Sequence, residues 1–129
     1  MRRDIFITKL EEIGVDTRGA LDRFMGDKDM YIRFVLRTNS MLRLDLMHYA
    51  IEDDDADAFY EAAMGIRGTA SNLGLLPVVE TLDDALVEFR SSRLRNPEKM
   101  QGLVHEMDEF LQKLTQLIRD YSNSLYTAS

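Results

Sequence analysis

The sequence predicts an all-α protein, an antiparallel four-helix bundle with short helices at its N-terminus. Three observations lead to this prediction. Apolar residues recur at steps of three and four along several long segments, as they do on the buried face of a helix. No segment alternates apolar and polar residues with a period of two, and no Asn-Gly or Asp-Gly pair marks a hairpin. The breaks between segments carry helix-capping residues.

The N-terminal part of the chain is typical of short helices. Asp16 precedes the segment TRGALDRFM and Asp27 precedes KDMYIRFVLR, and each aspartate can cap a helix N-terminus. The polar residues Thr38, Asn39 and Ser40 indicate a break before the segment MLRLDLMHYAI. We expect that segment to form another helix or a kinked continuation of the one before it.

Two long helices are expected next. Asp55 can cap the first, and Gly74 stands where a left-handed residue would end it. Pro77 suits the first turn of the second helix, which covers the segment VVETLDDALVEFR. The connections between these segments are short, which favours antiparallel neighbours.

The last helix has the strongest start signal in the chain. Asn96 and Pro97 combine an N-cap residue with a first-position proline, and the helix is expected to reach about Ser122. Its apolar residues define one stripe, which predicts the buried face: Met100, Leu103, Val104, Met107, Leu111, Leu114, Ile118 and Tyr121.

Length and composition limit the possible classes of function. The chain has 129 residues, enough for one core, and we expect a single domain over residues 1–129. Sixteen basic and 23 acidic residues give a net charge of −7 without a basic cluster, which argues against nucleic acid and anionic membranes as partners. The sequence shows no apolar stretch long enough for membrane insertion, no signal peptide and no cysteine. We therefore expect a cytoplasmic protein.

The helix from Asp55 to Leu73 is the most informative segment. At 100° per residue its apolar side chains fall on one side, which predicts the core face: Phe59, Ala62, Ala63, Ile66, Ala70 and Leu73. Met64 falls opposite this face. We expect an outward-facing patch around it, formed by Tyr60, Glu61, Met64, Gly65, Arg67, Gly68 and Ser71.

Two glycines inside this helix need an explanation, because each costs about 1 kcal/mol relative to alanine. Gly68 points outward one turn after Met64, so its missing side chain clears space for a molecule that approaches residue 64. Gly65 lies nearer the edge of the patch. It is explained equally well by close packing against another helix or by a glycine tolerated without a role.

The stretch FYEAAMGIRGTASNLGL resembles the signature helix of histidine-containing phosphotransfer (HPt) domains, which shuttle phosphoryl groups in phosphorelays. The pattern of that family is roughly A-H-x-[LI]-[KR]-G-x-[SA]-x-x-[LI]-G. The matching residues include Ala63, Ile66, Arg67, Gly68, Leu73 and Gly74. The segments DTRGALDRFMGDKDMYIRFV and MHYAIEDDDADAF are similar to the family's N-terminal helices and to the approach to its motif, so the resemblance covers about the whole chain.

One departure from the family pattern decides the expected chemistry. The phosphoacceptor histidine of the family falls at position 64, where this chain has Met64. An acceptor needs a ring nitrogen that is nucleophilic near pH 7, and a thioether forms no comparable phosphoryl adduct. We therefore expect no catalytic residue at this position and no enzymatic activity through it.

The resemblance favours a pseudo-phosphotransfer module that binds a response-regulator receiver domain or a sensor histidine kinase without carrying phosphate. Met64 would give the docking face a soft apolar knob suited to helix packing. Arg67 would place a cation beside it that attracts an acidic pocket. The outward patch defined above is thus the predicted partner-binding surface.

Two alternatives stay open. The chain could be an active phosphotransfer protein that uses another acceptor, and His48 is the credible candidate, with Asp45 one turn away on the same expected face. It could instead be a helical binding module unrelated to phosphorelay. His105 lies among acidic residues and is expected on a solvated face.

No metal or other cofactor is expected. The sequence contains no Glu-x-x-His pair of a di-metal bundle, no Walker-type glycine loop and no G-x-S-x-G elbow. The acidic run Glu52–Asp55 is explained as a solvated loop that complements the N-terminal dipole of the following helix.

Overall fold

The computed structural model describes residues 1–127, and every regular element in that part of the chain is a helix. The predicted all-α class is confirmed. The helices, in chain order, are α1 (Arg3–Glu12), α2 (Thr17–Arg23), α3 (Lys28–Val35), α4 (Thr38–Met41), α5 (Leu44–Glu52), α6 (Ala56–Leu73), α7 (Leu76–Ser92) and α8 (Pro97–Thr127). Within residues 1–127, no helix is both long enough and apolar enough to cross a membrane.

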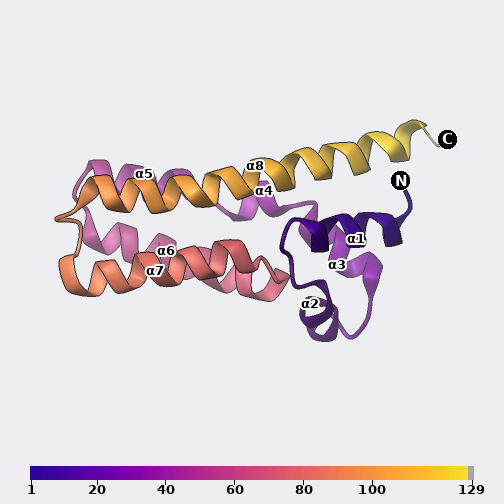
Figure 1. Ribbon diagram of the computed structural model, residues 1–129, viewed down its shortest axis with the longest axis horizontal. Coiled ribbons are helices and arrows are strands. Elements are labelled where there is room, and N and C mark those ends of the chain that lie inside the picture. The colour runs from indigo at the N-terminus through magenta and orange to yellow at the C-terminus, as the bar shows by residue number, and fades with distance from the viewer. Residues whose placement is uncertain (128–129) are drawn as a thin grey trace.

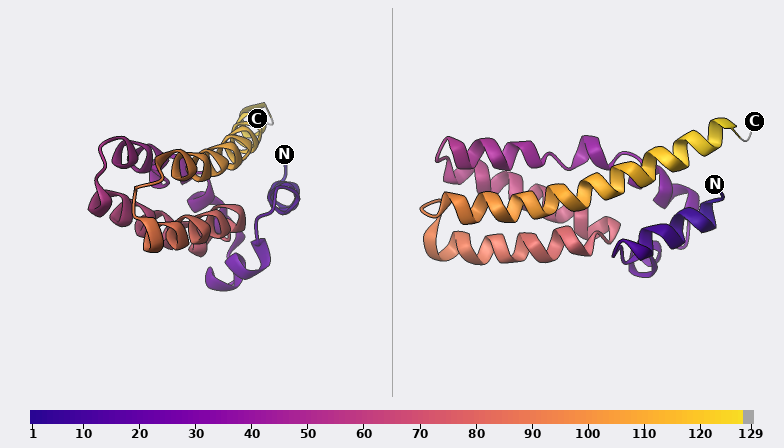
Figure 2. Two further views of the ribbon diagram at one scale, coloured as in Figure 1. Left: turned by 60° about the vertical axis from the view of Figure 1, so that its left-hand side comes forward. Right: turned by 45° about the horizontal axis from the view of Figure 1, so that its top comes forward.

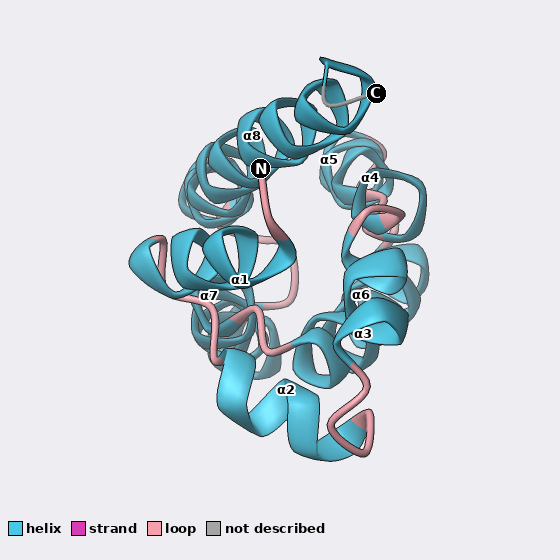
Figure 3. Ribbon diagram, turned by 90° about the vertical axis from the view of Figure 1, so that its right-hand side faces the viewer, coloured by secondary structure: helices cyan, strands magenta, loops and turns pink. Residues whose placement is uncertain are grey.

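The helices form a bundle, with the long helix α8 running along most of its length (Figure 1). Helix α5 packs against α6 and α8, and α7 packs against the same two helices. Helices α1, α2 and α3 gather at one end of the bundle, where both termini lie (Figures 1 and 2). At that end α1 packs against α8, while α2 and α3 pack against α6 (Figure 3).

The predicted helix starts are confirmed where a capping side chain sets them. Asp16, Asp27 and Asp55 each accept a hydrogen bond at 3.0 Å from the backbone N–H three residues further on. These bonds satisfy donors that have no partner inside the helix. Pro77 lies in the first turn of α7, and Pro97 is the first residue of α8.

Two predicted boundaries differ in the structure. The polar residues Thr38–Ser40, expected as a break, belong to the short helix α4. Thr38 is fully buried there, and its hydroxyl donates to the carbonyl of Val35, which explains how a polar residue fits inside the turn. Helix α8 continues beyond the expected Ser122 to Thr127.

The core lies between the apolar faces that the sequence predicts. In α6 the expected core residues are buried, except that Ala62 is half-buried. In α8 the expected stripe is buried, except that Leu103 and Leu111 are half-buried. Phe110 and Leu117 are also buried and were not predicted. They widen the buried face of α8, because this helix contacts α1 as well as α5 and α7.

The C-terminal end of α6 is held by the N-terminal helices through its backbone carbonyls. The guanidinium of Arg23 donates to the carbonyls of Ser71 and Asn72 at 2.7 and 3.1 Å. The hydroxyl of Tyr31 donates to the carbonyl of Leu73 at 2.9 Å. These contacts supply donors to the last carbonyls of α6; the carbonyl of Ser71 also accepts from the backbone N–H of Gly74 at 3.2 Å.

Gly74 completes this junction. It ends α6 in the left-handed conformation at φ +75°, as predicted, and its carbonyl accepts from the backbone N–H of Asp16 at 2.8 Å. A Cβ at position 74 would overlap the carbonyl oxygen of Asp16. Only glycine fits both the conformation and the close approach of the two chain segments.

We predict that Tyr31→Phe lowers the free energy of unfolding by about 1–3 kcal/mol, because the carbonyl of Leu73 then stays buried without this donor. Burial also raises the pKa of the Tyr31 hydroxyl, so this group remains a donor across the usual pH range. Denaturant titration measures the loss. Tyr49→Phe is the matched control, since Tyr49 is 56% exposed. Equal stabilities of the two variants would contradict the role of Tyr31.

Candidate functional site

The outer face of α6 carries the predicted patch. Phe59, Ala63 and Ile66 point into the core, which turns the side chains of Tyr60 and Met64 outward. Tyr60 is 49% exposed and Met64 is 43% exposed. The predicted orientation of Met64 is therefore confirmed: a thioether side chain stands at the surface, in the middle of an exposed helix face.

The two glycines of this face have no packing role within residues 1–127. A Cβ added at Gly65 or at Gly68 would meet no other atom within 4 Å. Close packing against a neighbouring helix, which the sequence left open for Gly65, is excluded among the described residues. Each glycine destabilises α6 by about 1 kcal/mol relative to alanine, and no contact within the described fold offsets this. What they provide is open space beside Met64.

Arg67, expected as a cation beside Met64, forms an ion pair with a neighbouring helix. Its Nε donates to Oδ1 of Asp83, on α7, at 2.7 Å. This hydrogen bond, together with the charge of Asp83, raises the pKa of the Arg67 guanidinium. Arg67 is therefore drawn toward α7, and much of its charge is compensated there. A partner that needs this cation has to compete with Asp83, whose side chain is 49% exposed.

Of the two remaining patch residues, one is exposed to solvent and the other contacts the N-terminal helices. Glu61 is exposed. Ser71 is half-buried, and its carbonyl accepts the hydrogen bond from Arg23. The structure thus brings Tyr60, Glu61, Met64 and the glycines together as an accessible face, with Ser71 at its edge near α2.

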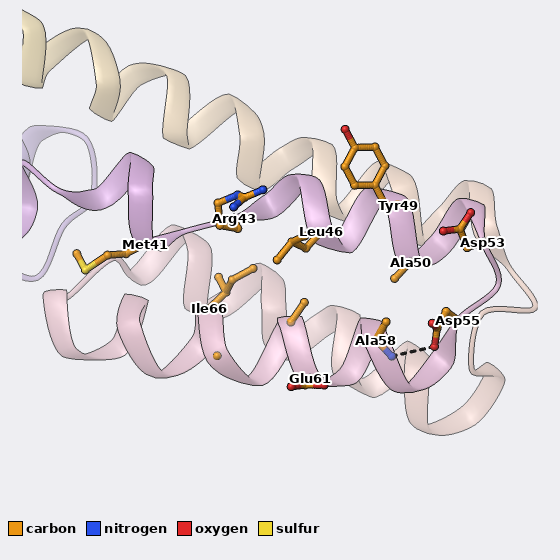
Figure 4. A pocket seen from close by; sticks show the side chains of 12 residues that line it. Met41, Arg43, Leu46, Tyr49, Ala50, Asp53, Asp55, Ala58, Glu61 and Ile66 are labelled. Carbon is orange, nitrogen blue, oxygen red and sulfur yellow. Dashed lines mark hydrogen bonds between the residues drawn. The ribbon is translucent and has the colours of Figure 1, made fainter.

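A groove beside this face was not predicted. It lies between α5 and α6, has a volume of about 500 Å³ and is lined mainly by apolar and small side chains (Figure 4). Leu46 and Tyr49 project from α5 and are 45% and 56% exposed. Ala58, Ala62 and Gly65 line it from α6. The one signal in the sequence was the pair of large apolar residues on the outer side of α5, opposite small residues of α6.

His48 occupies a different environment from the expected one. Asp45, the predicted neighbour, pairs instead with Arg43 at 2.8 Å. The ring of His48 bridges α5 to α8: its Nε2 lies 2.6 Å from Oδ2 of Asp108, and its Nδ1 contacts Oε1 of Gln101. The side-chain amide of Gln101 also donates to the backbone carbonyl of His48 at 3.3 Å. That bond fixes the amide orientation, so its oxygen faces the ring.

This arrangement favours the protonated ring. Partial burial lowers the pKa of His48, but the hydrogen bonds with Asp108 and Gln101 outweigh burial, so the pKa of His48 lies above its usual value. Both ring nitrogens face acceptor oxygens and both must donate, which only the imidazolium form can do. An imidazolium has no lone pair with which to attack phosphorus. The geometry therefore disfavours His48 as a phosphoacceptor.

His105 lies on an exposed face, as expected. Its Nε2 is 3.1 Å from Oε1 of Glu109, and both side chains are about two thirds exposed, at 67% and 62%. Within residues 1–127, no group of three or more His, Cys, Asp or Glu side chains is arranged to hold a metal ion.

The comparisons with known proteins add no assignment. No family model, no curated protein and no solved structure matches the chain. The resemblance to HPt domains therefore rests on the residues of the motif and its flanking segments.

We predict that His48 makes the stability of the protein pH-dependent. Because the folded-state pKa of His48 is raised, its contribution is fully present below about pH 6.5 and is lost as the pH rises through the raised value. The wild-type protein should therefore exceed the His48→Gln variant in free energy of unfolding by more at about pH 5.5 than at about pH 8.5. Denaturant titrations at both pH values measure this difference.

The control for this prediction is His105→Gln, which removes a histidine from an exposed pair of small energetic value. A difference between wild type and His48→Gln that stays constant over this pH range would contradict the bridging role of the charged ring.

Proposed function

We propose that this protein is an HPt-like module of a phosphorelay that docks a receiver domain or a sensor kinase domain and carries no phosphate. The single observation that carries the proposal is the exposed Met64, at the position where the resembled family keeps its acceptor histidine. The motif residues around it are otherwise present. Such a protein would act in the cytoplasm, as a competitor or scaffold for phosphorylated partners.

The shape of the α6 face supports docking. Met64 offers a flexible side chain and Tyr60 a planar aromatic ring, and both are exposed. Gly65 and Gly68 leave open surface around them. Tyr60 is held in place by stacking against Phe89 of α7, with ring centroids 5.9 Å apart. An exposed methionine on a helix face that the neighbouring glycines leave open is typical of the anchor residues in protein interfaces.

The arrangement of the helices is compatible with the same family. We propose that α5, α6, α7 and α8 form an antiparallel four-helix bundle of the HPt type, with α1, α2 and α3 as the N-terminal helices. The packing of α5 and α7 each against both α6 and α8 supports this description. In such a bundle the motif helix presents one face to the core and one to the partner.

The chemistry at position 64 is that of a binding residue. The sulfur of Met64 has no proton to lose and forms no stable bond to a phosphoryl group, so a phosphorylated partner would keep its phosphate. The neighbouring Arg67 has its guanidinium engaged by Asp83 rather than free beside position 64. Binding through apolar contact is what these residues can do.

The test uses purified protein and each phosphorylated receiver domain of the source organism. We predict that the wild-type protein takes up no acid-labile label, whereas Met64→His accepts label from the receiver that normally docks here. The introduced imidazole would stand on an exposed face with open space beside it. Transfer to the variant is read as acid-labile radioactivity on this chain.

Met30→His is the matched control, because Met30 is a helical methionine of similar exposure, 39%, on another helix, α3. It should stay unlabelled. Label on the wild-type protein that disappears in His48→Ala would assign the acceptor to His48 and overturn the proposal. Failure of Met64→His with every receiver would contradict the docking role of the α6 face and favour a binding module outside phosphorelay.

A further inference from the structure

The groove between α5 and α6 has a shape that suits a helix. Its sides carry the exposed side chains of Leu46 and Tyr49, and its α6 side is built from Ala58, Ala62 and Gly65. Small residues let the backbone of an incoming helix approach closely, while the larger ones cover its flanks. Helix α5 has nine residues, which corresponds to a length of roughly 13 Å. A partner helix of two to three turns would match that length.

The charges of the groove are unevenly distributed. Asp53 and Asp55 lie at the end formed by the connection between α5 and α6, and Glu61 lies further along α6 (Figure 4). Asp55 uses one oxygen to cap α6. Asp53 and Glu61 have no ion-pair partner within residues 1–127. The lining cation, Arg43, is paired with Asp45. The groove is therefore apolar along most of its length, with Asp53 and Asp55 at one end and Glu61 on its α6 side.

We propose that this groove binds an amphipathic helix of a partner protein, whose apolar side chains lie between α5 and α6 and whose Lys or Arg residues meet Asp53, Asp55 and Glu61. Apolar residues at spacing i, i+3 or i+4, and i+7 would fill the groove. Basic residues would neutralise its acidic end. A second copy of this chain fits less well, because it carries a formal charge of −7.

The inference goes beyond the proposed function, since it concerns the chemistry of the bound element and holds whether or not the partner belongs to a phosphorelay. It adds α5 to the surface predicted from α6. Gly65 belongs to both surfaces. A larger residue at this position should block the groove without disturbing the fold, because its Cβ would meet no atom within 4 Å and a non-glycine residue favours the helix.

The test begins with selection of helical binders from a displayed library of random peptides of about 16 residues, using the full-length protein as bait. The expected peptides carry the spaced apolar residues and an excess of Lys and Arg. A synthetic copy of the best peptide is then titrated against wild type and variants by fluorescence anisotropy. Gly65→Gln should weaken its binding by about tenfold or more, because the added side chain occupies the groove.

Gly102→Gln is the matched control. Gly102 is also an exposed helical glycine at which an added Cβ would meet nothing within 4 Å, but it lies on α8, outside the groove. It should change the affinity by less than about twofold. The double variant Asp53→Asn, Glu61→Gln should weaken binding and reduce its salt dependence, since two of the pairing charges are gone.

The proposal would be overturned by selection that yields no binder, by peptides without a basic excess, or by binding that Gly65→Gln leaves unchanged. A dimer of this chain in sedimentation experiments that Gly65→Gln dissociates would replace the partner helix by a second copy and would also overturn it. None of these results depends on phosphoryl transfer to Met64→His, so the groove and the proposed function can fail separately.

Discussion

The arrangement of the site depends on the hydrogen bonds that α2 and α3, with the cap residue of α2, donate to the last carbonyls of α6. The backbone carbonyls of residues 71–74 accept hydrogen bonds from Arg23, Tyr31 and the backbone N–H of Asp16. These bonds fix where α6 ends and tie it to the N-terminal helices. Together with the buried stripe of α6, they leave the helix little freedom to rotate or slide. The face around Met64 is therefore a rigid surface.

That face is destabilising for the fold. Gly65 and Gly68 weaken α6, and no contact within residues 1–127 offsets this cost. Met64 and the exposed part of Tyr60, whose ring stacks on Phe89, leave apolar surface in water. The groove toward α5 extends the same surface with two more exposed side chains, Leu46 and Tyr49. Glycines that no contact within residues 1–127 explains, beside exposed apolar side chains, are features expected of a binding surface.

The sequence was most informative where a feature depends on one helix alone, although it missed the short helix α4 and the true end of α8. The caps at Asp16, Asp27 and Asp55 and the outward direction of Met64 follow from local signals and from the helical period. Features that need two helices could not be predicted, because the sequence does not say which side chains meet. The bond of Arg67 to Asp83 joins residues 16 apart, and that of His48 to Asp108 joins residues 60 apart.

The most direct measurement of docking through the α6 face is NMR of the eight methionine methyl groups during titration with a receiver or kinase domain. We predict that the Met64 signal shifts or broadens on binding, while buried methionines such as Met47 and Met107 and the exposed Met30 keep theirs. A bound complex in which Met64 stays unchanged and Met30 shifts would contradict this docking mode, because the partner would then lie on the N-terminal helices.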